Sequence, residues 1–433
     1  MKTSNYNFTL KTSTKNLIYN SISDSYVSVT DNILELLESN KLDKIGEEGL
    51  SILEKGNFII SDNFDEYHFL EEIYTETINS NTYHLTLLPT LDCNVNCWYC
   101  FEKKVEGSRF SKVIKDSILK HLEVIITTKP NIEYYVIEFF GGEPLLDFEN
   151  NLQALLIDIN DLLKYHNKIS SFLFVTNGLC INPHIIQQFK GLKVKFQISI
   201  DGYKKKHDSI KKIKSNEVKS SYDLVMGNIR LLTSNLDTHI NLRINYDNNT
   251  LKYASEIIES IKDVPRNKLS IHLERVWQTI DNNTKDNQEL KRFIEAFLSN
   301  GFSISYLNLF HKGYTCKASK SNQAVVTYDG NVYKCSGRDF DIQSKEGVLR
   351  TDGVIKWNTE KLNRRLDIKT YDNTTCKSCK LLPLCWGPCC QKQLEMIQRG
   401  TNIENLCQLR KIEIPLNEYL LYRFMSEKNR MKQ

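Results

Sequence analysis

The chain has 433 residues, 40% of them hydrophobic and 25% charged, so it can bury a core, and its length allows more than one domain. Its 57 Lys and Arg against 53 Asp and Glu give a net charge of +4, too balanced to indicate a nucleic-acid or membrane partner. No apolar run approaches the roughly 18–20 residues of a membrane span, and the N-terminus lacks a signal-peptide stretch, so we expect a cytoplasmic protein.

Residues 1–80 predict a small α+β module, and this segment contains no cysteine. Alternating apolar residues at 6–10 and 17–29 indicate short strands, while amphipathic stretches at 32–42 and 46–55 indicate helices. An apolar run at 56–60 follows. A small fold of this kind does not by itself specify a partner, so a binding module and a packing scaffold are equally compatible with it.

Residues 81–300 predict strands that alternate with helices. The predicted strands are 84–89, 134–140, 172–176, 194–200, 240–245 and 269–273, and the predicted helices are 113–126, 152–165, 185–192, 222–232 and 253–261. This alternation indicates an α/β fold with a parallel sheet and right-handed crossovers. Six strands are too few for a closed eight-stranded barrel, and ligand groups are expected at the C-terminal ends of the strands.

Three cysteines lie close together directly after the first of these strands. Cys93, Cys97 and Cys100 have x3 and x2 spacing, and Tyr99 precedes the last of them. Four-iron clusters are usually held by four thiolates, so three thiolates leave one iron open for another ligand. A zinc knuckle or a loop of reduced thiols is the alternative. The motif resembles the signature of radical S-adenosylmethionine (SAM) enzymes, in which SAM binds the open iron.

This resemblance implies a partial (β/α)6 TIM-like barrel and assigns the strand-end residues to SAM. Gly141-Gly142-Glu143-Pro144 would contact the methionyl amino group, Thr176-Asn177 the ribose or carboxylate, and Tyr99 the adenine. Ser199 and Asp201, followed by His207-Asp208, also match the family pattern, with His207 predicted as a structural turn residue.

One position departs from the family pattern. Lys211 stands where the family often has Arg, and a Lys ammonium is a point donor rather than a planar fork. A bidentate grip on the SAM carboxylate from this position is therefore in doubt, and Arg243 is a candidate to compensate. Cys180, outside both groups of cysteines, is predicted to be a small buried apolar residue.

The region 301–415 contains most of the remaining cysteines, and residues 416–433 are predicted as a C-terminal tail. The spacing of seven cysteines resembles the SPASM domain, which holds two auxiliary four-iron clusters. That resemblance assigns Cys316, Cys335 and Cys389 to the first auxiliary cluster and Cys376, Cys379, Cys385 and Cys407 to the second. Two structural zinc sites are the alternative.

Two four-iron clusters require eight ligands, and seven are assigned. Cys390, His311, water or a substrate thiolate could complete the first auxiliary cluster. An open iron beside a radical site would suit capture of a substrate thiolate.

The resemblance as a whole implies SAM and three [4Fe-4S] clusters as cofactors. It favours a peptide maturase that crosslinks a ribosomal precursor peptide through a thioether or carbon–carbon bond, with a winged-helix-like module at 1–80 for the precursor. The expected electron donor is flavodoxin- or ferredoxin-like. The nearer alternative is an anaerobic sulfatase-maturating enzyme, although Cys335 is followed by Ser336 rather than the usual Asp, with Asp339 close by. The distant alternative is a zinc-binding scaffold.

Overall fold

One large sheet dominates the fold. The computed structural model describes residues 1–12, 15–213, 219–279, 286–306, 315–400 and 406–433. Its 11-stranded sheet runs, in spatial order, through β12 (Ser303–Tyr306), β11 (Leu269–Arg275), β10 (His239–Tyr246), β9 (Val194–Ile200), β8 (Ile169–Thr176), β7 (Tyr134–Phe139), β6 (Thr82–Leu88), β13 (Gln323–Thr327), β14 (Asn331–Tyr333), β15 (Gly347–Leu349) and β16 (Ile355–Trp357). Neighbouring strands are parallel from β12 to β13 and antiparallel from β13 to β16.

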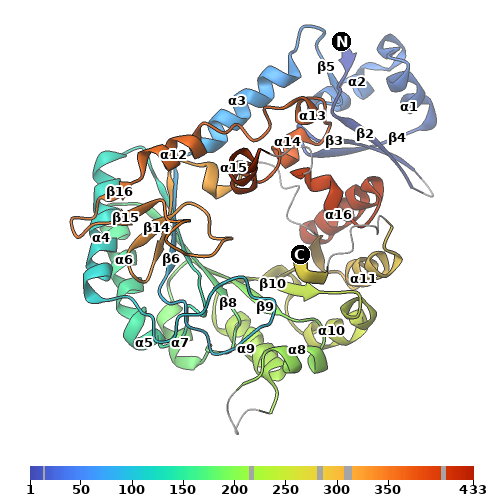
Figure 1. Ribbon diagram of the computed structural model, residues 1–433. Helices are drawn as coiled ribbons and strands as arrows, with labels where there is room; N and C mark the ends of the chain where they lie inside the picture. The colour runs from blue at the N-terminus through green and yellow to red at the C-terminus, as the bar shows by residue number, and fades with distance from the viewer. Residues whose placement is uncertain (13–14, 214–218, 280–285, 307–314, 401–405) are drawn as a thin grey trace.

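Helices connect the parallel strands and lie around the outside of the curved sheet (Figure 1). Strand residues that point outward, such as Leu85, Ile137 and Leu242, are completely buried against them. The alternate positions on the same strands carry polar residues such as Thr86 and Arg243, because successive strand side chains point to opposite faces. The helices are α4 (Lys112–Thr128), α5 (Phe148–Asn151), α6 (Gln153–Tyr165), α7 (Pro183–Phe189), α8 (Lys204–Ile210), α9 (Ser221–Asn235), α10 (Ala254–Ile261) and α11 (Gln288–Ser299), with 3-10 turns η2 (Thr250–Tyr253), η3 (Arg266–Lys268) and η4 (Trp277–Thr279).

All six predicted strands are present, but the prediction of a six-stranded barrel was incomplete. β12 and β13 extend the parallel sheet at both sides, so eight strands, β6–β12 and β13, run parallel to their neighbours. β12 has only four residues, Ser-Ile-Ser-Tyr, which give a weak apolar pattern. β13 comes from the cysteine-rich region and pairs with β6 across more than 200 residues of chain, a contact that local patterns do not predict.

Residues 1–80 contain both strands and helices, and their role as a separate module stays a prediction. An antiparallel sheet contains β2 (Asn7–Lys11), β3 (Asn16–Asn20) and β4 (Ser25–Val29), and β1 (Lys2–Thr3) pairs with β5 (Ile59–Ile60). The helices are α1 (Asp31–Glu38), η1 (Leu42–Lys44), α2 (Glu47–Lys55) and α3 (Glu66–Ile78). The apolar run predicted at 17–29 is two strands rather than one, because the chain turns at Asp24, where φ is 57°.

This module packs on the C-terminal half of the chain. Tyr74 of α3 contacts Tyr371 and Trp386, with ring centroids 4.7 and 5.4 Å away. Asp24 forms a 2.7 Å ion pair with Arg423. Residues 18–59 have a hydrophobic cluster of their own, and a second cluster joins α3 to the cysteine-rich region. α3 runs from the rest of the module toward the cysteine-rich helices (Figure 1).

The predicted C-terminal tail is instead the helix α16 (Leu416–Met431). Ser426 of α16 accepts a 2.8 Å hydrogen bond from the backbone N–H of Ile304, which satisfies a donor of the edge strand β12. The cysteine-rich region before it contains η5 (Lys317–Ser319), α12 (Thr359–Leu366), α13 (Thr374–Lys377), α14 (Leu382–Cys385), α15 (Cys390–Arg399) and η7 (Gln408–Lys411). Across the described residues, no helix combines the length and the apolar character that crossing a membrane requires.

Candidate metal and cofactor centre

The loop that carries Cys93, Cys97 and Cys100 begins four residues after β6. The Asp92 carboxylate connects the two ends of this loop. Asp92 Oδ1 accepts a hydrogen bond from the N–H of Cys93 and Asp92 Oδ2 accepts one from the N–H of Gly107, both at 2.8 Å. Lys104 donates to the carbonyl oxygen of Cys93 at 2.5 Å. Cys93 and Cys97 are half-buried and Cys100 is exposed. The loop thus holds three neighbouring thiols at the C-terminal edge of the sheet.

Burial is the main reason that these thiols resist ionisation. It raises the pKa of Cys93 to about 12 and that of Cys97 to about 11, and the neighbouring thiols add to both shifts. A metal ligand must be a thiolate, so the loop requires a positively charged centre to stabilise the ionised form. The Lys211 ammonium opposes the rise in the pKa of Cys97 and so favours the Cys97 thiolate.

Gly141 and Gly142 pack directly against this loop. A Cβ atom on Gly142 would lie 2.1 Å from the carbonyl oxygen of Asp92, and one on Gly141 would lie 2.4 Å from that of Thr90. Gly141 also has a φ of 114°, which favours glycine. The two glycines therefore allow the backbone to approach the cysteine loop closely, and Pro144 follows as a buried residue.

Glu143 joins the ends of two strands. Its carboxylate is completely buried; Oε1 accepts from the Thr176 hydroxyl at 2.6 Å and Oε2 from the N–H of Asn177 at 2.8 Å. Oε1 also accepts from the N–H of Leu145 at 3.1 Å. Burial raises the pKa of Glu143, and these hydrogen bonds oppose the shift. Because a carboxylate has about four acceptor positions, one remains for an ammonium donor.

Asp201 contacts the other members of a second group of strand-end residues. It is 1% exposed, and its Oδ1 accepts from the hydroxyl of Tyr99 and from Asn245 Nδ2. Lys211 Nζ lies 3.5 Å from its Oδ2. Burial disfavours the Asp201 charge, yet Lys211 and the hydrogen bonds keep its pKa below the usual value. Asn245 was not predicted as a site residue from the sequence, although it lies two residues after Arg243 and therefore on the same face of β10.

Lys211 cannot readily serve as a ligand contact in this arrangement. The residue is 2% exposed, and its ammonium donates to the carbonyl oxygen of Ser199 at 2.5 Å and to the Ser199 hydroxyl at 3.0 Å. Its charge also pairs with Asp201, whose Oδ2 lies 3.5 Å away but accepts no hydrogen bond from the described residues. Arg243 is half-buried, and within the described chain its only hydrogen bond runs from Nε to Asn245 at 3.1 Å. No described residue accepts a hydrogen bond from its two Nη groups, and the Arg243 charge helps to lower the pKa of the nearby Glu274 carboxyl.

His207 agrees with its predicted structural role, and Cys180 agrees only in part with its predicted burial. His207 is completely buried and its Nδ1 accepts from the N–H of Asp201 at 3.1 Å, in agreement with a structural histidine. Burial lowers the pKa of His207 to about 3. Cys180 was predicted to be a buried apolar residue, and it does pack against the hydrophobic core, although it is only partly buried. It is half-buried, and Asn94 of the cysteine loop donates to its sulfur at 3.4 Å. This contact joins two loops, so a local pattern could not predict it.

The C-terminal cysteines gather as two groups. Burial raises the pKa of Cys316 to about 12, and the thiols of Cys389 and Cys335 contribute to this shift. Burial likewise raises the pKa of Cys385 to about 12, with contributions from Cys376, Cys379 and Cys407. Cys390 also contributes to the shift of Cys316, and the assignment of these thiols to two clusters stays a prediction. No three Cys, His, Asp or Glu side chains of the described residues converge on a site for a single metal ion.

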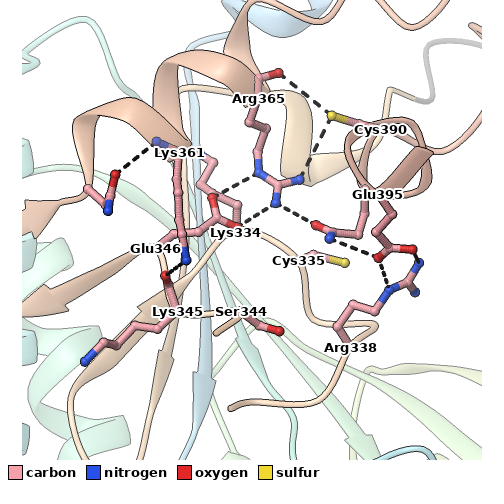
Figure 2. A network of polar contacts seen from close by, with 12 residues as sticks. Lys334, Cys335, Arg338, Ser344, Lys345, Glu346, Lys361, Arg365, Cys390 and Glu395 are labelled. Carbon is pink, nitrogen blue, oxygen red and sulfur yellow. Dashed lines mark hydrogen bonds and ion pairs between the residues drawn. The ribbon is translucent and has the colours of Figure 1, made fainter. Parts of the chain in front are cut away.

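Cys390 also lies near the first group but is held by Arg365 (Figure 2). Its thiol is completely buried and donates to the carbonyl oxygen of Arg365 at 3.8 Å. The Arg365 guanidinium lies 4.0 Å from the same sulfur and forms a bidentate pair with Glu346 at 2.6 and 3.0 Å. His311, the other protein candidate for the missing ligand, lies outside the described residues.

Comparisons with known proteins agree with this geometry. Residues 87–244 match the family model of the radical SAM superfamily. The chain is 26% identical over 346 residues to a cysteine-type anaerobic sulfatase-maturating enzyme of Clostridium novyi, covering 73% of this chain and 90% of the relative. It is 24% identical over 393 residues to the radical SAM cyclopropyl synthase TigE of Paramaledivibacter caminithermalis, covering 83% and 78%.

Two solved structures share the fold. The sulfatase-maturating enzyme anSMEcpe with bound AdoMet has a TM-score of 0.52 at 18% identity, covering 81% of this chain and 97% of that one. SuiB of Streptococcus suis, bound to its precursor peptide SuiA, has a TM-score of 0.50 at 13% identity, covering 96% and 99%. The family implies SAM and a four-iron cluster, and the cysteine-rich region fits a SPASM domain. The chain therefore carries a radical SAM domain over residues 87–244.

Proposed function

We propose that this chain is a cytoplasmic radical SAM peptide maturase that crosslinks a ribosomal precursor peptide through a thioether or carbon–carbon bond. SuiB, which is bound to a precursor peptide, supports the substrate class, and TigE, which is named a radical SAM cyclopropyl synthase, supports formation of carbon–carbon bonds. The α+β module at residues 1–80 would take part in precursor recognition. An electron donor of the flavodoxin or ferredoxin type would reduce the enzyme.

The residues at the strand ends fit SAM and its cluster. Cys93, Cys97 and Cys100 would hold the cluster, since they are neighbouring thiols at a strand end. Glu143 would accept from the SAM ammonium, and the Nη groups of Arg243 would hold its carboxylate. When bound, SAM and the reduced cluster supply a radical that abstracts hydrogen from an unactivated C–H bond.

Hydrogen bonds and an ion pair fix the ends of β8 and β9 and so support these contacts. The residues that make them are Thr176, Asn177, Ser199, Asp201 and Lys211. Tyr99 is anchored to Asp201 through its hydroxyl, so its ring is held in place beside the site assigned to adenine.

The observation that carries the thioether proposal is the position of Cys390. Cys316, Cys335 and Cys389 are half-buried and near enough for the other two thiols to raise the pKa of Cys316, whereas the fourth nearby thiol, Cys390, is completely buried and bound to Arg365. The first auxiliary group thus has three accessible thiols for a cluster that takes four ligands. A thiolate of the substrate would fill the fourth position.

Sulfatase maturation is the second candidate, and Asp339 favours it. Burial raises the pKa of Glu102 to about 8, and the Asp339 carboxylate adds to that shift and to the raised pKa of Cys100. Asp339 thus brings a carboxylate from the cysteine-rich region to the radical loop. In a formylglycine-forming enzyme it would receive the substrate proton.

Metal content and SAM cleavage test the proposal together. Three clusters predict about twelve iron atoms per chain in anaerobically reconstituted protein, and little zinc. Replacing Cys93, Cys97 and Cys100 by Ala should remove about four iron atoms and abolish 5′-deoxyadenosine formation. Zinc in place of iron would favour the distant alternative of a zinc-binding scaffold, and persistent SAM cleavage in the triple variant would contradict the assignment of the radical cluster.

A further inference from the structure

Two arginines lie close to the first group of C-terminal cysteines. Arg338 follows Cys335 by three residues, and in the view of Figure 2 the Cys335 sulfur lies between Arg338 and Arg365. Both guanidinium groups oppose the rise in the pKa of Cys335, and Arg338 has the larger effect. The backbone N–H of Gly337 also donates to the Cys335 sulfur, at 3.4 Å. Positive charge and a hydrogen-bond donor therefore meet at one thiol of this group.

An ion pair joins the loop after β14 to the helix α15. Arg338 donates to Glu395 of α15 at 2.7 Å, and Cys389 lies directly before the first residue of this helix. Gln391 connects the pair to the second arginine, because it donates to Glu395 at 3.1 Å and accepts from Arg365 at 2.6 Å. The ten-residue helix also directs the positive end of its dipole toward Cys389. The two arginines are thus held in one network around the first group.

The second group of cysteines has different surroundings. In the part of the chain that the structure describes, no Arg or Lys contributes to the raised pKa of Cys376 or Cys379. The lysines next to them in the sequence are exposed and have other partners: Lys377 is paired with Asp372, and Lys380 donates to a backbone carbonyl of the N-terminal module. The two groups therefore differ in the positive charge that acts on their thiols.

The surroundings of Cys316 fit an acceptor that the chain itself does not supply. The Thr315 hydroxyl next to it in the sequence is buried, and no described residue forms a hydrogen bond with this hydroxyl. Such a group suits the sulfur atoms of an iron–sulfur cluster. Hydrogen bonds to those sulfurs and nearby charges both set the reduction potential of a cluster.

We propose that Arg338 stabilises added negative charge at the first auxiliary centre and thereby raises the reduction potential of that centre above the potential of the second. The inference rests on the proposed function, in which a substrate thiolate brings negative charge to the first centre. A nearby cation favours the more negative state of a centre, whether the charge arrives as an electron or as a thiolate. The reduction potential measures this stabilisation without a substrate.

Redox titration tests the proposal on the reconstituted full-length chain. Each variant also carries Cys93→Ala, Cys97→Ala and Cys100→Ala, so that electron paramagnetic resonance at controlled potentials reports the auxiliary centres alone. Arg338→Gln should make reduction of one centre about tenfold less favourable, a fall of about 59 mV in its one-electron potential, and should leave the other centre unchanged. Arg338→Lys keeps the charge and should retain most of the potential.

Glu395→Gln gives the sharper comparison. It removes the negative partner of Arg338, so the potential of the same centre should rise, opposite to the effect of Arg338→Gln. The two side chains are 34% and 33% exposed, so losing the pair should leave the fold intact. Arg230→Gln is the matched control. Arg230 forms a similar pair with Asp263, at 2.6 and 2.8 Å, on α9 and away from α15 (Figure 1), and its loss should change neither potential.

Three results would overturn the proposal. They are unchanged potentials in Arg338→Gln, equal shifts of both centres, and shifts of the same sign in Arg338→Gln and Glu395→Gln. Loss of about four iron atoms in both Arg338→Gln and Arg338→Lys would also overturn it, because Arg338 would then be required for assembly.

Failure of the proposed function looks different. Without auxiliary clusters, the chain with the three Cys→Ala changes would bind little iron instead of about eight atoms. Failure of peptide crosslinking alone would leave the titration result as it is.

Discussion

The thiol of Cys390 points to the carbonyl oxygen of Arg365, 3.8 Å away, and is completely buried, while Cys389 beside it is half-buried. Adjacent cysteines thus have different surroundings. Cys389 is at the N-terminal boundary of α15 and lies with Cys316, whereas Cys390 contacts the Arg365–Glu346 pair (Figure 2).

This difference predicts opposite results for two alanine variants. Cys390→Ala should keep about twelve iron atoms per chain, because the residue is held by Arg365 and not needed as a ligand. Cys389→Ala should lose about four iron atoms while SAM still binds the radical cluster. Iron analysis and electron paramagnetic resonance of the reconstituted proteins measure both. Loss of a whole cluster in Cys390→Ala would make Cys390 the eighth ligand and favour carbon–carbon crosslinking over thioether formation.

Gly142→Ala should damage the radical cluster. Its Cβ atom would lie 2.1 Å from the carbonyl oxygen of Asp92, so the cysteine loop must move. We expect iron content to fall by about four atoms and SAM cleavage to be lost. Gly227→Ala is the matched control: this glycine of α9 has no atom within 4 Å of the added Cβ, and alanine favours a helix by up to about 1 kcal/mol. Normal iron content in Gly142→Ala would show that the loop tolerates the shift.

His121 predicts a pH dependence of folding. It is buried, with Nδ1 2.7 Å from the carbonyl oxygen of Gly353 and Nε2 2.6 Å from the Tyr83 hydroxyl. Burial lowers its pKa from 6.5 to about 4, so the unfolded chain binds the proton more readily. The stability that the neutral ring contributes is therefore complete above about pH 6.5 and lost as the pH falls toward 4.

At about pH 5 this loss amounts to about 2 kcal/mol. His121→Leu has no such proton to bind, so its stability deficit relative to the unmodified chain should be about 2 kcal/mol smaller at pH 5 than at pH 7.5. Denaturant unfolding of the metal-free proteins at both pH values measures the difference. A deficit that is the same at both would mean that His121 is protonated without cost in the folded chain.

The sequence predicted the parallel strands well because each combines an apolar pattern with a helix after it. β9 was predicted with its observed bounds, and the strand-end motifs follow from it and its neighbours. Glu143, Asn177 and Asp201 were therefore placed on one edge of the sheet before their contacts were known. Their partners within the protein, such as Thr176 for Glu143, required the three-dimensional structure.

Contacts between distant segments could not be predicted. The contact between Arg365 and Cys390 joins residues 25 positions apart in the sequence. Cys389 and Cys390 share the same local sequence pattern, so the pattern does not show which of the two Arg365 contacts. Ser426 reaches β12 from 122 residues away, which is why residues 416–433 resembled a tail. The contacts of Lys211 with Ser199 and Asp201 could not be predicted either. The sequence shows that the planar guanidinium of an Arg is absent at this position, but it does not show which groups the Lys211 ammonium contacts.

Mass spectrometry of a modified peptide tests peptide crosslinking most directly. The reconstituted enzyme is incubated anaerobically with SAM, dithionite and the peptide of a neighbouring small open reading frame, with a cysteine-containing sulfatase peptide in a parallel reaction. We predict a product of the precursor that lacks about two hydrogen atoms per crosslink and resists fragmentation across the joined residues. A thioether product disappears when the acceptor Cys is replaced by Ser, whereas a carbon–carbon crosslink between other residues remains. Formylglycine in the sulfatase peptide, with an unchanged precursor, would contradict the proposal and establish the sulfatase-maturating alternative.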